Sequence, residues 1–387
     1  MHKKTKESIT LLLRRISTIG DTYEQHKEDL DYKSFLEMQL ELIKRITETE
    51  RRIQKLKKED PNDPHKIQKA QETRMLLKLL GTTIAWILLE FDRPYIRNFA
   101  RGHDSGFLFG KKGLELERLV LKAAFKGKNS AAILHDITNC LRIGDLTVIG
   151  PRGFSTLELK QSARKKKFDR RGLRQKRRGE NAKEFYDRKI STKIHSGYRA
   201  VAHSFKKIDK HNWKQACAVI AEADKKGHGI RIVEECLVYF AFKDEVPNEV
   251  FSYLKSLRDT HIMFGCQDKH ILGIPTIMPF TCFDIPLSYK EKLLFGEINF
   301  CVLLDLNSLC RILEKNGFKC RVLKDLEVRI FGSIIEIFDK THKNLGYGTI
   351  TYGMISRLLY ECLSIRTFVD YARNGASKIS EMLELDP

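Results

Sequence analysis

Residues 142–162 read RIGDLTVIGPRGFSTLELKQS, and this stretch decides how the middle of the chain is interpreted. Two runs rich in β-branched and apolar residues, 142–149 and 154–159, lie on either side of Gly150-Pro151-Arg152-Gly153. Such runs favour β-strands, and glycine and proline together favour a turn. The pattern therefore predicts a β-hairpin, and the apolar period over 114–125 predicts a helix before it.

The polar residues of this hairpin fit the chemistry of phosphodiester hydrolysis. That reaction needs a divalent cation, which neutralises the phosphate and acidifies a water molecule, and a group that positions the water. Asp145 lies at the start of the first predicted strand and Glu158 lies on the second. We expect both to bind Mg²⁺ or Mn²⁺, with the Leu159 carbonyl as a further ligand. Alternation along the strand puts Lys160 on the same face as Glu158, where it would orient or deprotonate the water.

Glu158-Leu159-Lys160 is the only Glu-x-Lys in the chain. Asp-x-Lys occurs three times, at 31–33, 187–189 and 224–226, each time within a helical pattern that has no partner strand. The single Glu-x-Lys instead follows a turn, thirteen residues after Asp145, and a basic run comes directly behind it. The alternative is an ordinary hairpin in which Glu158 forms a surface ion pair with a lysine.

This arrangement resembles the PD-(D/E)xK phosphodiesterase superfamily, which includes restriction endonucleases and Holliday-junction resolvases. In that family a glutamate on a preceding helix joins the metal-binding aspartate and the Glu-x-Lys strand. Glu117 matches this glutamate best, and Glu115 is the second choice. Gln161-Ser162 also fits the family, whereas Gly144 stands where a proline usually precedes the aspartate. The resemblance implies a restriction-endonuclease-like mixed sheet flanked by helices, with magnesium-dependent nuclease activity and Glu117 among the catalytic residues.

The charge of the chain favours nucleic acid as a partner. There are 70 lysines and arginines against 50 acidic residues, which leaves a formal charge of +20. Basic groups near phosphates release condensed counterions, so they add affinity that does not depend on the base sequence. The predicted phosphate contacts lie in the basic run behind the hairpin: Lys165, Lys166, Lys167, Arg170, Arg171, Arg174, Arg177 and Arg178. DNA is the expected polymer, and RNA stays open because nothing here reads a 2′-hydroxyl.

Changes of pattern along the chain suggest three domains: a helical hairpin arm over 1–95, the nuclease-like domain over 96–244, and an α/β domain of unknown role over 245–387. The overall fold class is therefore α/β (α+β). Asp63 and Pro64 are expected to begin the second helix of the arm. The arm could form a homodimer, dock a partner or support the next domain.

Periodicity predicts further elements along the chain. They are a helix over 186–205, a helix over 212–224, one strand or two short ones over 230–242, a strand over 298–306, a helix that Asn307 caps and Gly317 ends, and a helix over 355–371.

Several other features narrow the interpretation. Nine cysteines without a C-x-x-C pair predict reduced thiols and a cytoplasmic location. The longest apolar stretch, 82–91, is too short to cross a bilayer, so a buried helix and no membrane partner are expected. His135-Asp136 is interpreted as a surface pair, with Asp136 kept as an accessory acid. Gly110-Lys111-Lys112-Gly113 lacks the P-loop pattern and is interpreted as a DNA-contacting loop or a helix entry.

Together these features predict a cytoplasmic Mg²⁺- or Mn²⁺-dependent nuclease that acts on DNA. An effector role in antiviral defence or in a mobile-element system follows only by analogy. One alternative is a nucleic-acid-binding protein on a degenerate nuclease fold, without catalysis. Another is an interaction scaffold whose arm dimerises and whose basic run binds an acidic partner.

Overall fold

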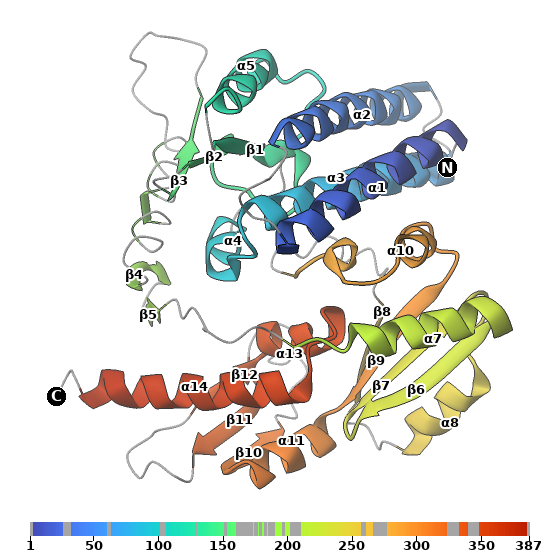
Figure 1. The fold of residues 1–387 in the computed structure, drawn as a ribbon, viewed down its shortest axis with the longest axis vertical. Coiled ribbons are helices and arrows are strands. Elements are labelled where there is room, and N and C mark those ends of the chain that lie inside the picture. Colours follow the sequence, from blue (N-terminus) through green and yellow to red (C-terminus); the bar gives the residue numbers. More distant parts are fainter. Residues whose placement is uncertain are drawn as a thin grey trace. The chain divides into compact units, whose positions relative to one another are not determined.

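The chain is a mixed α/β protein with small antiparallel sheets, and it divides into two compact units (Figure 1). The first unit comprises Met1–Phe205 with Lys269–Cys282, and the second comprises Lys206–Asp268 with Phe283–Pro387. The computed structural model describes the residues 3–25, 32–59, 63–100, 106–127, 130–150, 153–159, 173, 177, 180–181, 184, 190–195, 198–201, 210–256, 261–265, 277–322, 333–339 and 348–384.

Three helices form the arm of the first unit: α1 (Lys3–Gln25), α2 (Tyr32–Glu59) and α3 (Pro64–Leu88). Both α1 and α2 pack against α3, so the predicted helical hairpin is confirmed and a third helix joins it. The Asp63 side chain accepts a hydrogen bond from the backbone N–H of Lys66 at 3.1 Å. This is the expected cap, and it satisfies one of the donors that a helix start leaves unpaired.

Residues 82–88 of the apolar stretch 82–91 form the buried end of α3, and residues 89–91 form a turn after it. Ile84 is 0% exposed and Trp86 is 1% exposed, so the prediction of a buried helix is confirmed for 82–88. Over the part of the chain that the structure describes, no helix is long and apolar enough to cross a membrane.

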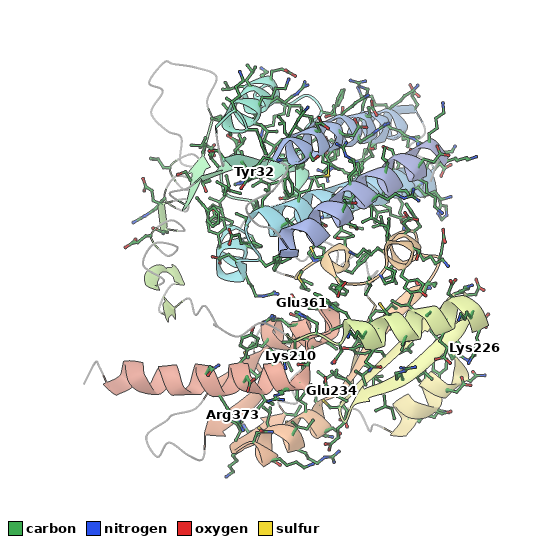
Figure 2. All side chains as sticks on the ribbon, in the orientation of Figure 1. Tyr32, Lys210, Lys226, Glu234, Glu361 and Arg373 are labelled. Atoms are coloured by element: carbon green, nitrogen blue, oxygen red, sulfur yellow. The ribbon has the colours of Figure 1, made fainter. Side chains whose placement is uncertain are left out.

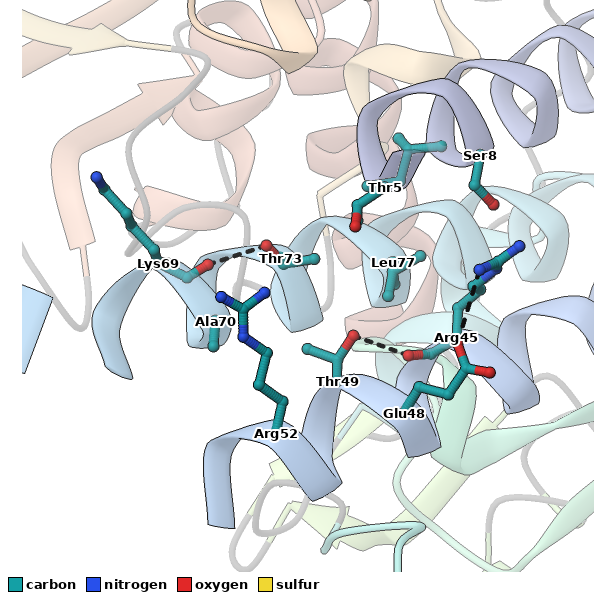
Figure 3. A pocket seen from close by; sticks show the side chains of 11 residues that line it. Thr5, Ser8, Arg45, Glu48, Thr49, Arg52, Lys69, Ala70, Thr73 and Leu77 are labelled. Atoms are coloured by element: carbon teal, nitrogen blue, oxygen red, sulfur yellow. Dashed lines mark hydrogen bonds and ion pairs between the residues drawn. The ribbon is translucent and has the colours of Figure 1, made fainter. Parts of the chain in front are cut away.

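A cavity of about 370 Å³ lies among α1, α2 and α3 (Figure 3). Arg45, Arg52 and Lys69 line it together with several hydroxyl groups. Two of these hydroxyls, from Thr49 and Thr73, donate to carbonyls of their own helices at 2.8 and 2.9 Å. None of the predicted catalytic residues lines this cavity.

After α4 (Arg93–Phe99) and α5 (Leu114–Ala124), the chain forms a three-stranded antiparallel sheet in the order β1-β2-β3. The strands are β1 (Ala131–Leu134), β2 (Leu146–Gly150) and β3 (Gly153–Leu157). Leu146 pairs with Leu157, and Gly150 pairs with Gly153 across the turn. The predicted helix and hairpin are therefore confirmed, although β3 ends one residue before Glu158.

The arm holds this sheet in place. Buried Gln39 of α2 donates to the carbonyl of Ala132 at 2.8 Å and accepts from the N–H of Leu134 at 3.1 Å, so it pairs with the outer edge of β1. On α3, a Cβ added to Gly81 would lie 2.0 Å from the carbonyl oxygen of Ile137. That close approach seats the short helix η2 (His135–Ile137) directly against α3.

The expected domain boundaries at 95/96 and 244/245 do not coincide with the two units. Helices α2 and α3 contact β1 and η2, which places the arm and the small sheet in the first unit. In the second unit, β9 (Asn299–Asp305) pairs with β7 (Leu237–Phe242), so its sheet spans the second expected boundary.

The predicted helix over 186–205 is wrong. Residues of this stretch form the antiparallel hairpin of β4 (Ile190–His195) and β5 (Tyr198–Val201). The physical reason is that Ile190, Thr192 and Ile194 are β-branched and recur with a period of two. That period suits a strand, and β-branched side chains lose rotamer freedom in a helix.

The second unit contains an antiparallel sheet in the order β6-β7-β9-β8, with β6 (His228–Glu234) and β8 (His261–Gly265) at its edges. Helix α7 (Trp213–Lys226) packs on β6 and β7. The helix predicted over 212–224 and the strand over 298–306 are confirmed, and 230–242 forms two strands. The remaining elements are α8 (Asn248–Ser256), η3 (Phe280–Cys282, in the first unit), α10 (Leu287–Leu294), α11 (Leu306–Lys315), β10 (Phe318–Val322), β11 (Ser333–Asp339), β12 (Gly348–Thr351), α13 (Tyr352–Tyr360) and α14 (Ile365–Glu384).

Two predicted details of the second unit are wrong. Asp305, rather than Asn307, caps α11, because its side chain accepts the backbone N–H of Asn307 at 2.9 Å. The helix predicted over 355–371 is broken into α13 and α14, and Cys362 between them has a φ of 53°. Glu234, Lys210 and Glu361, labelled in Figure 2, belong to the segments that meet at this break.

Hydrogen bonds from distant segments stabilise the break between α13 and α14. The Glu234 side chain accepts the N–H of Ile365 at 3.1 Å, which caps the start of α14. The carbonyl of Lys210 accepts the N–H of Ser364 at 2.8 Å. No local pattern contains these partners, which explains why periodicity alone joined the two helices.

Candidate active site

The backbone of Asp145 is held from both sides at the entrance to β2. Its N–H donates to the carbonyl of Leu157 at 2.8 Å, and its carbonyl accepts the N–H of His135 at 3.0 Å. The residue is therefore paired with the end of β3 on one side and with the start of η2 on the other. Its side chain is 17% exposed, so the carboxylate faces a partly enclosed space.

Gly144 explains why Gly-Asp replaces the expected Pro-Asp. Its φ is +81°, in the left-handed region that proline cannot adopt. A Cβ added there would lie 2.6 Å from Cγ2 of Thr156 and 3.0 Å from the carbonyl oxygen of Leu157. Only glycine fits this approach of the chain to β3, and this approach places Asp145 beside the end of that strand.

The Asp145 carboxylate joins two parts of the site. Its Oδ2 accepts the backbone N–H of Leu159 at 2.7 Å, while its Oδ1 lies 3.3 Å from Nζ of Lys111. Glu158 lies between the two residues, Leu157 and Leu159, that hydrogen-bond to Asp145. The start of β2 and the Glu-Leu step after β3 are thus adjacent.

Three carboxylates from three separate segments of the chain converge on one ammonium group. Nζ of Lys111 lies 2.6 Å from Oε1 of Glu117 on α5, 2.6 Å from Oδ2 of Asp136 on η2, and 3.3 Å from Oδ1 of Asp145. We call these three carboxylates the acidic cluster. Burial alone would lower the pKa of Lys111, but the charge of Asp136 and the hydrogen bonds outweigh it, so the pKa is raised.

Glu117 is the most buried carboxylate of the acidic cluster. It is 2% exposed, and its Oε2 has no hydrogen-bond partner in the described part of the chain. Burial raises the pKa of its carboxyl to about 7, against the lowering effect of the bond to Lys111. An unpaired buried carboxylate oxygen is costly, so this atom retains an unused capacity to bind a cation or a proton.

The loop that carries Lys111 is anchored to the arm. Buried Glu50 of α2 accepts the N–H of Phe109 at 2.9 Å and pairs with Nε of Arg74 at 2.6 Å. Arg74 also donates to the carbonyl of Gly106 at 3.2 Å. These contacts fix the backbone of the loop a few residues before Lys111, while its side chain is 27% exposed.

His135 is a neutral side chain that packs next to the candidate site. Its Nδ1 is 3.1 Å from the carbonyl oxygen of Gly144 and its Nε2 is 2.8 Å from Oγ1 of Thr147. Because a carbonyl only accepts, Nδ1 carries the proton and Nε2 accepts from the threonine. Burial lowers the pKa of His135 to about 4. The interpretation of His135 as a surface residue is wrong, since it is 1% exposed.

The predicted catalytic residues differ in position and exposure. It brings Glu117 and Asp145 together through Lys111, whereas Glu115 is exposed and pairs with Arg118 at 2.9 Å. Glu158 is exposed and lies just beyond β3.

The remaining predicted residues lie mostly outside the described part of the chain. Lys160 is one of these, and so are seven of the predicted phosphate contacts: Lys165, Lys166, Lys167, Arg170, Arg171, Arg174 and Arg178. Arg177 is described and exposed.

Sequence reasoning missed Lys111 and kept Asp136 only in reserve. In the sequence Lys111 belongs to a glycine-flanked loop, and no motif indicates that its ammonium points at Glu117, six residues later. The only indication in the sequence is that this loop lies a few residues before the predicted catalytic glutamate. Asp136 joins the site because η2 turns the chain between β1 and β2.

The donors of the acidic cluster are hard oxygens, the kind that Mg²⁺ and Mn²⁺ prefer. Within the described residues, no three His, Cys, Asp or Glu side chains are placed to hold a metal ion together. Mg²⁺ commonly binds through one or two carboxylates, with water and a substrate phosphate completing its shell. Asp145 and Glu117 fit that requirement, because both already contact one cation and Glu117 has an unpaired oxygen.

No protein-family model, curated protein or solved structure matches this chain.

Proposed function

We propose that the chain is a metal-dependent nuclease whose active site is built around Asp145. The observation that carries this proposal is the convergence of Glu117, Asp136 and Asp145 on a single cation position beside the end of β3. Nucleic acid is the proposed substrate, and DNA is preferred to RNA. The net charge of +20 supports a polyanionic partner.

The order of elements supports the resemblance to the PD-(D/E)xK superfamily. A helix with a buried glutamate, α5, precedes an antiparallel meander of three strands. Asp145 lies immediately before the second strand, and Glu158 lies immediately after the third. This order matches the pattern that the family implies. A restriction-endonuclease-like fold for the whole domain is part of the proposal.

The residues have distinct proposed roles. Asp145 and Glu158, with the Leu159 carbonyl, would hold Mg²⁺ or Mn²⁺, and Glu117 would join them as a direct ligand or through a water molecule. When bound, the ion would neutralise charge on the scissile phosphate and acidify a water. Lys160 would orient that water, and the basic run from Lys165 to Arg178 would hold the phosphate backbone.

One observation favours a second function, nucleic-acid binding without catalysis. Lys111 already neutralises part of the acidic cluster through two contacts of 2.6 Å. A degenerate nuclease could keep such an internal ion pair in place of a metal ion. It would bind DNA in a salt-sensitive manner and would cut nothing.

Cleavage and binding assays separate these two functions. Supercoiled, linear and single-stranded DNA, and RNA, are incubated with Mg²⁺, Mn²⁺ or EDTA. The variants are Asp145→Asn, Glu117→Gln, Glu158→Gln and Lys160→Met. Glu115→Gln is the matched control, because it removes a carboxylate from the exposed side of α5 and leaves the acidic cluster intact.

The nuclease proposal predicts metal-dependent cutting by the parent chain and by Glu115→Gln. Asp145→Asn and Glu158→Gln should lose at least a hundredfold in rate while DNA binding persists. Cutting that survives in these two variants would contradict the assignment of the site. Binding without cutting under every condition would favour the non-catalytic function.

A further inference from the structure

We infer that the acidic cluster is one cation site that the Lys111 ammonium and a divalent ion occupy in turn. This inference rests on the proposed metal dependence. It adds that the Lys111 ammonium competes with the metal ion for the same carboxylates. Lys111 would hold the carboxylates together while no metal is bound, and Mg²⁺ or Mn²⁺ would displace its side chain.

The contacts of Lys111 define a cation position in three dimensions. The ammonium meets carboxylate oxygens of Glu117, Asp136 and Asp145, which come from α5, η2 and the start of β2. These acids are separated in sequence, so only the fold brings them to one point. Three carboxylates against one ammonium leave an excess of negative charge when all are ionised. That excess favours a divalent ion over a monovalent one, with Glu117 and Asp145 as its direct ligands and the charge of Asp136 adding to the attraction.

A second observation indicates a ligand beyond the lysine. Glu117 is 2% exposed and is directed into the cluster, since its Oε1 contacts Lys111. Its Oε2 is buried and has no hydrogen-bond partner among the described residues. The ammonium therefore satisfies only one of the two oxygens of this carboxylate. A divalent ion has several ligand positions, so it can bind the unpaired oxygen of Glu117 as well as the oxygens that contact Lys111.

The loop allows the lysine side chain to leave without unfolding. The backbone before it is held by Glu50, which accepts the N–H of Phe109 at 2.9 Å. The carbonyl of Lys111 accepts the N–H of Leu114 at 3.3 Å, at the entrance to α5. The side chain is 27% exposed, and its ammonium group is carried by a flexible four-carbon stem. A rotamer change therefore moves the ammonium into solvent while the backbone stays anchored.

The test is Mn²⁺ binding to the full chain, measured by isothermal titration calorimetry without any nucleic acid. Lys111→Met removes the competing ammonium and keeps a side chain of similar length. Lys112→Met is the matched control, because it removes the same charge from the adjacent, exposed position. We expect Lys111→Met to bind Mn²⁺ at least tenfold more tightly than the parent chain, and Lys112→Met to change the affinity less than threefold.

A double variant locates the bound ion. Adding Glu117→Gln to Lys111→Met should remove most of the gained affinity if the ion binds at the acidic cluster. Gained affinity that persists in the double variant would place the ion elsewhere and overturn the inference. Mn²⁺ affinity that is unchanged or weaker in Lys111→Met would also overturn it.

A measurement on the parent chain covers the case in which Lys111→Met does not fold. Acylation of lysines by an amine-reactive reagent is followed by mass spectrometry with and without Mn²⁺. Displacement predicts that labelling of Lys111 rises at least threefold with Mn²⁺, while that of Lys112 stays constant. Equal labelling of Lys111 in both conditions contradicts the displacement.

These results separate the inference from the proposed nuclease function. Metal-dependent cutting together with unchanged Mn²⁺ affinity in Lys111→Met would reject the competition and retain the nuclease. No Mn²⁺ binding by either protein, with no cutting, would reject both. Tighter binding in Lys111→Met without cutting would support the shared cation site on a protein that does not catalyse.

Discussion

Gly144→Ala should destabilise the first unit by about 3 kcal/mol, and Gly110→Ala by about 1 kcal/mol. Both glycines have a φ of +81°, so alanine meets a similar backbone strain at each position. They differ in what surrounds the new methyl group. At Gly110 nothing lies within 4 Å of it, whereas at Gly144 it would lie 2.6 Å from Thr156 and 3.0 Å from Leu157.

The two magnitudes follow from these surroundings. Left-handed backbone costs an ordinary residue roughly 1–2 kcal/mol, and this accounts for Gly110→Ala. Overpacking typically adds 1–3 kcal/mol, because β3 must move away from the start of β2. That movement also weakens the 2.8 Å hydrogen bond between the N–H of Asp145 and the carbonyl of Leu157. Gly144→Ala should therefore impair the candidate active site as well as stability.

Urea denaturation read by pulsed hydrogen exchange and mass spectrometry measures both variants. Peptides from β1 and α3 report the first unit separately from the second. A free-energy loss for Gly144→Ala that is no larger than that for Gly110→Ala would refute the steric argument. It would mean that β3 accommodates the methyl group freely.

Two further predictions concern buried polar groups of the first unit. The pKa of His135 falls to about 4 in the fold, so stability present above pH 6.5 is lost as the pH falls towards 4; between pH 7.5 and pH 5.0 the loss is about 2 kcal/mol. His135→Gln should lose this share of the pH dependence in urea denaturation, and parallel curves for the two proteins would contradict it. Gln39→Leu should cost about 2–3 kcal/mol, because the carbonyl of Ala132 and the N–H of Leu134 would be buried without partners. Gln68→Leu, at an exposed position of α3, should stay within about 0.5 kcal/mol of the parent chain, and equal losses for the two variants would oppose a special role for Gln39.

Elements with local causes were predictable from the sequence. Asp63 and Pro64 mark the start of α3 by themselves, because capping involves only neighbouring residues. The glycines and the proline over 150–153 predict a turn, and Gly150 and Gly153 pair where β2 and β3 meet. Asp145 could be selected from its place in this hairpin, whereas Glu117 was indicated by the resemblance to the PD-(D/E)xK superfamily.

Elements with distant causes were not predictable. Lys111 reaches the acidic cluster because Glu50, more than fifty residues earlier, anchors its loop. The break between α13 and α14 depends on Glu234, a residue of the distant strand β6. In the stretch that forms β4, Ile190 and Ile194 fit both a helical and a strand period. The intervening Thr192, a β-branched residue, favours the strand.

The rate of Mg²⁺-dependent DNA cleavage by Asp145→Asn, relative to the parent chain, tests whether Asp145 lies at the centre of a nuclease active site. Asparagine keeps the size of the side chain and an acceptor oxygen for the N–H of Leu159, so the fold should persist. We predict cutting by the parent chain and a loss of at least a hundredfold in the variant, with DNA affinity changed less than threefold. Equal rates for the two proteins would contradict the claim that Asp145 lies at the centre of a nuclease active site.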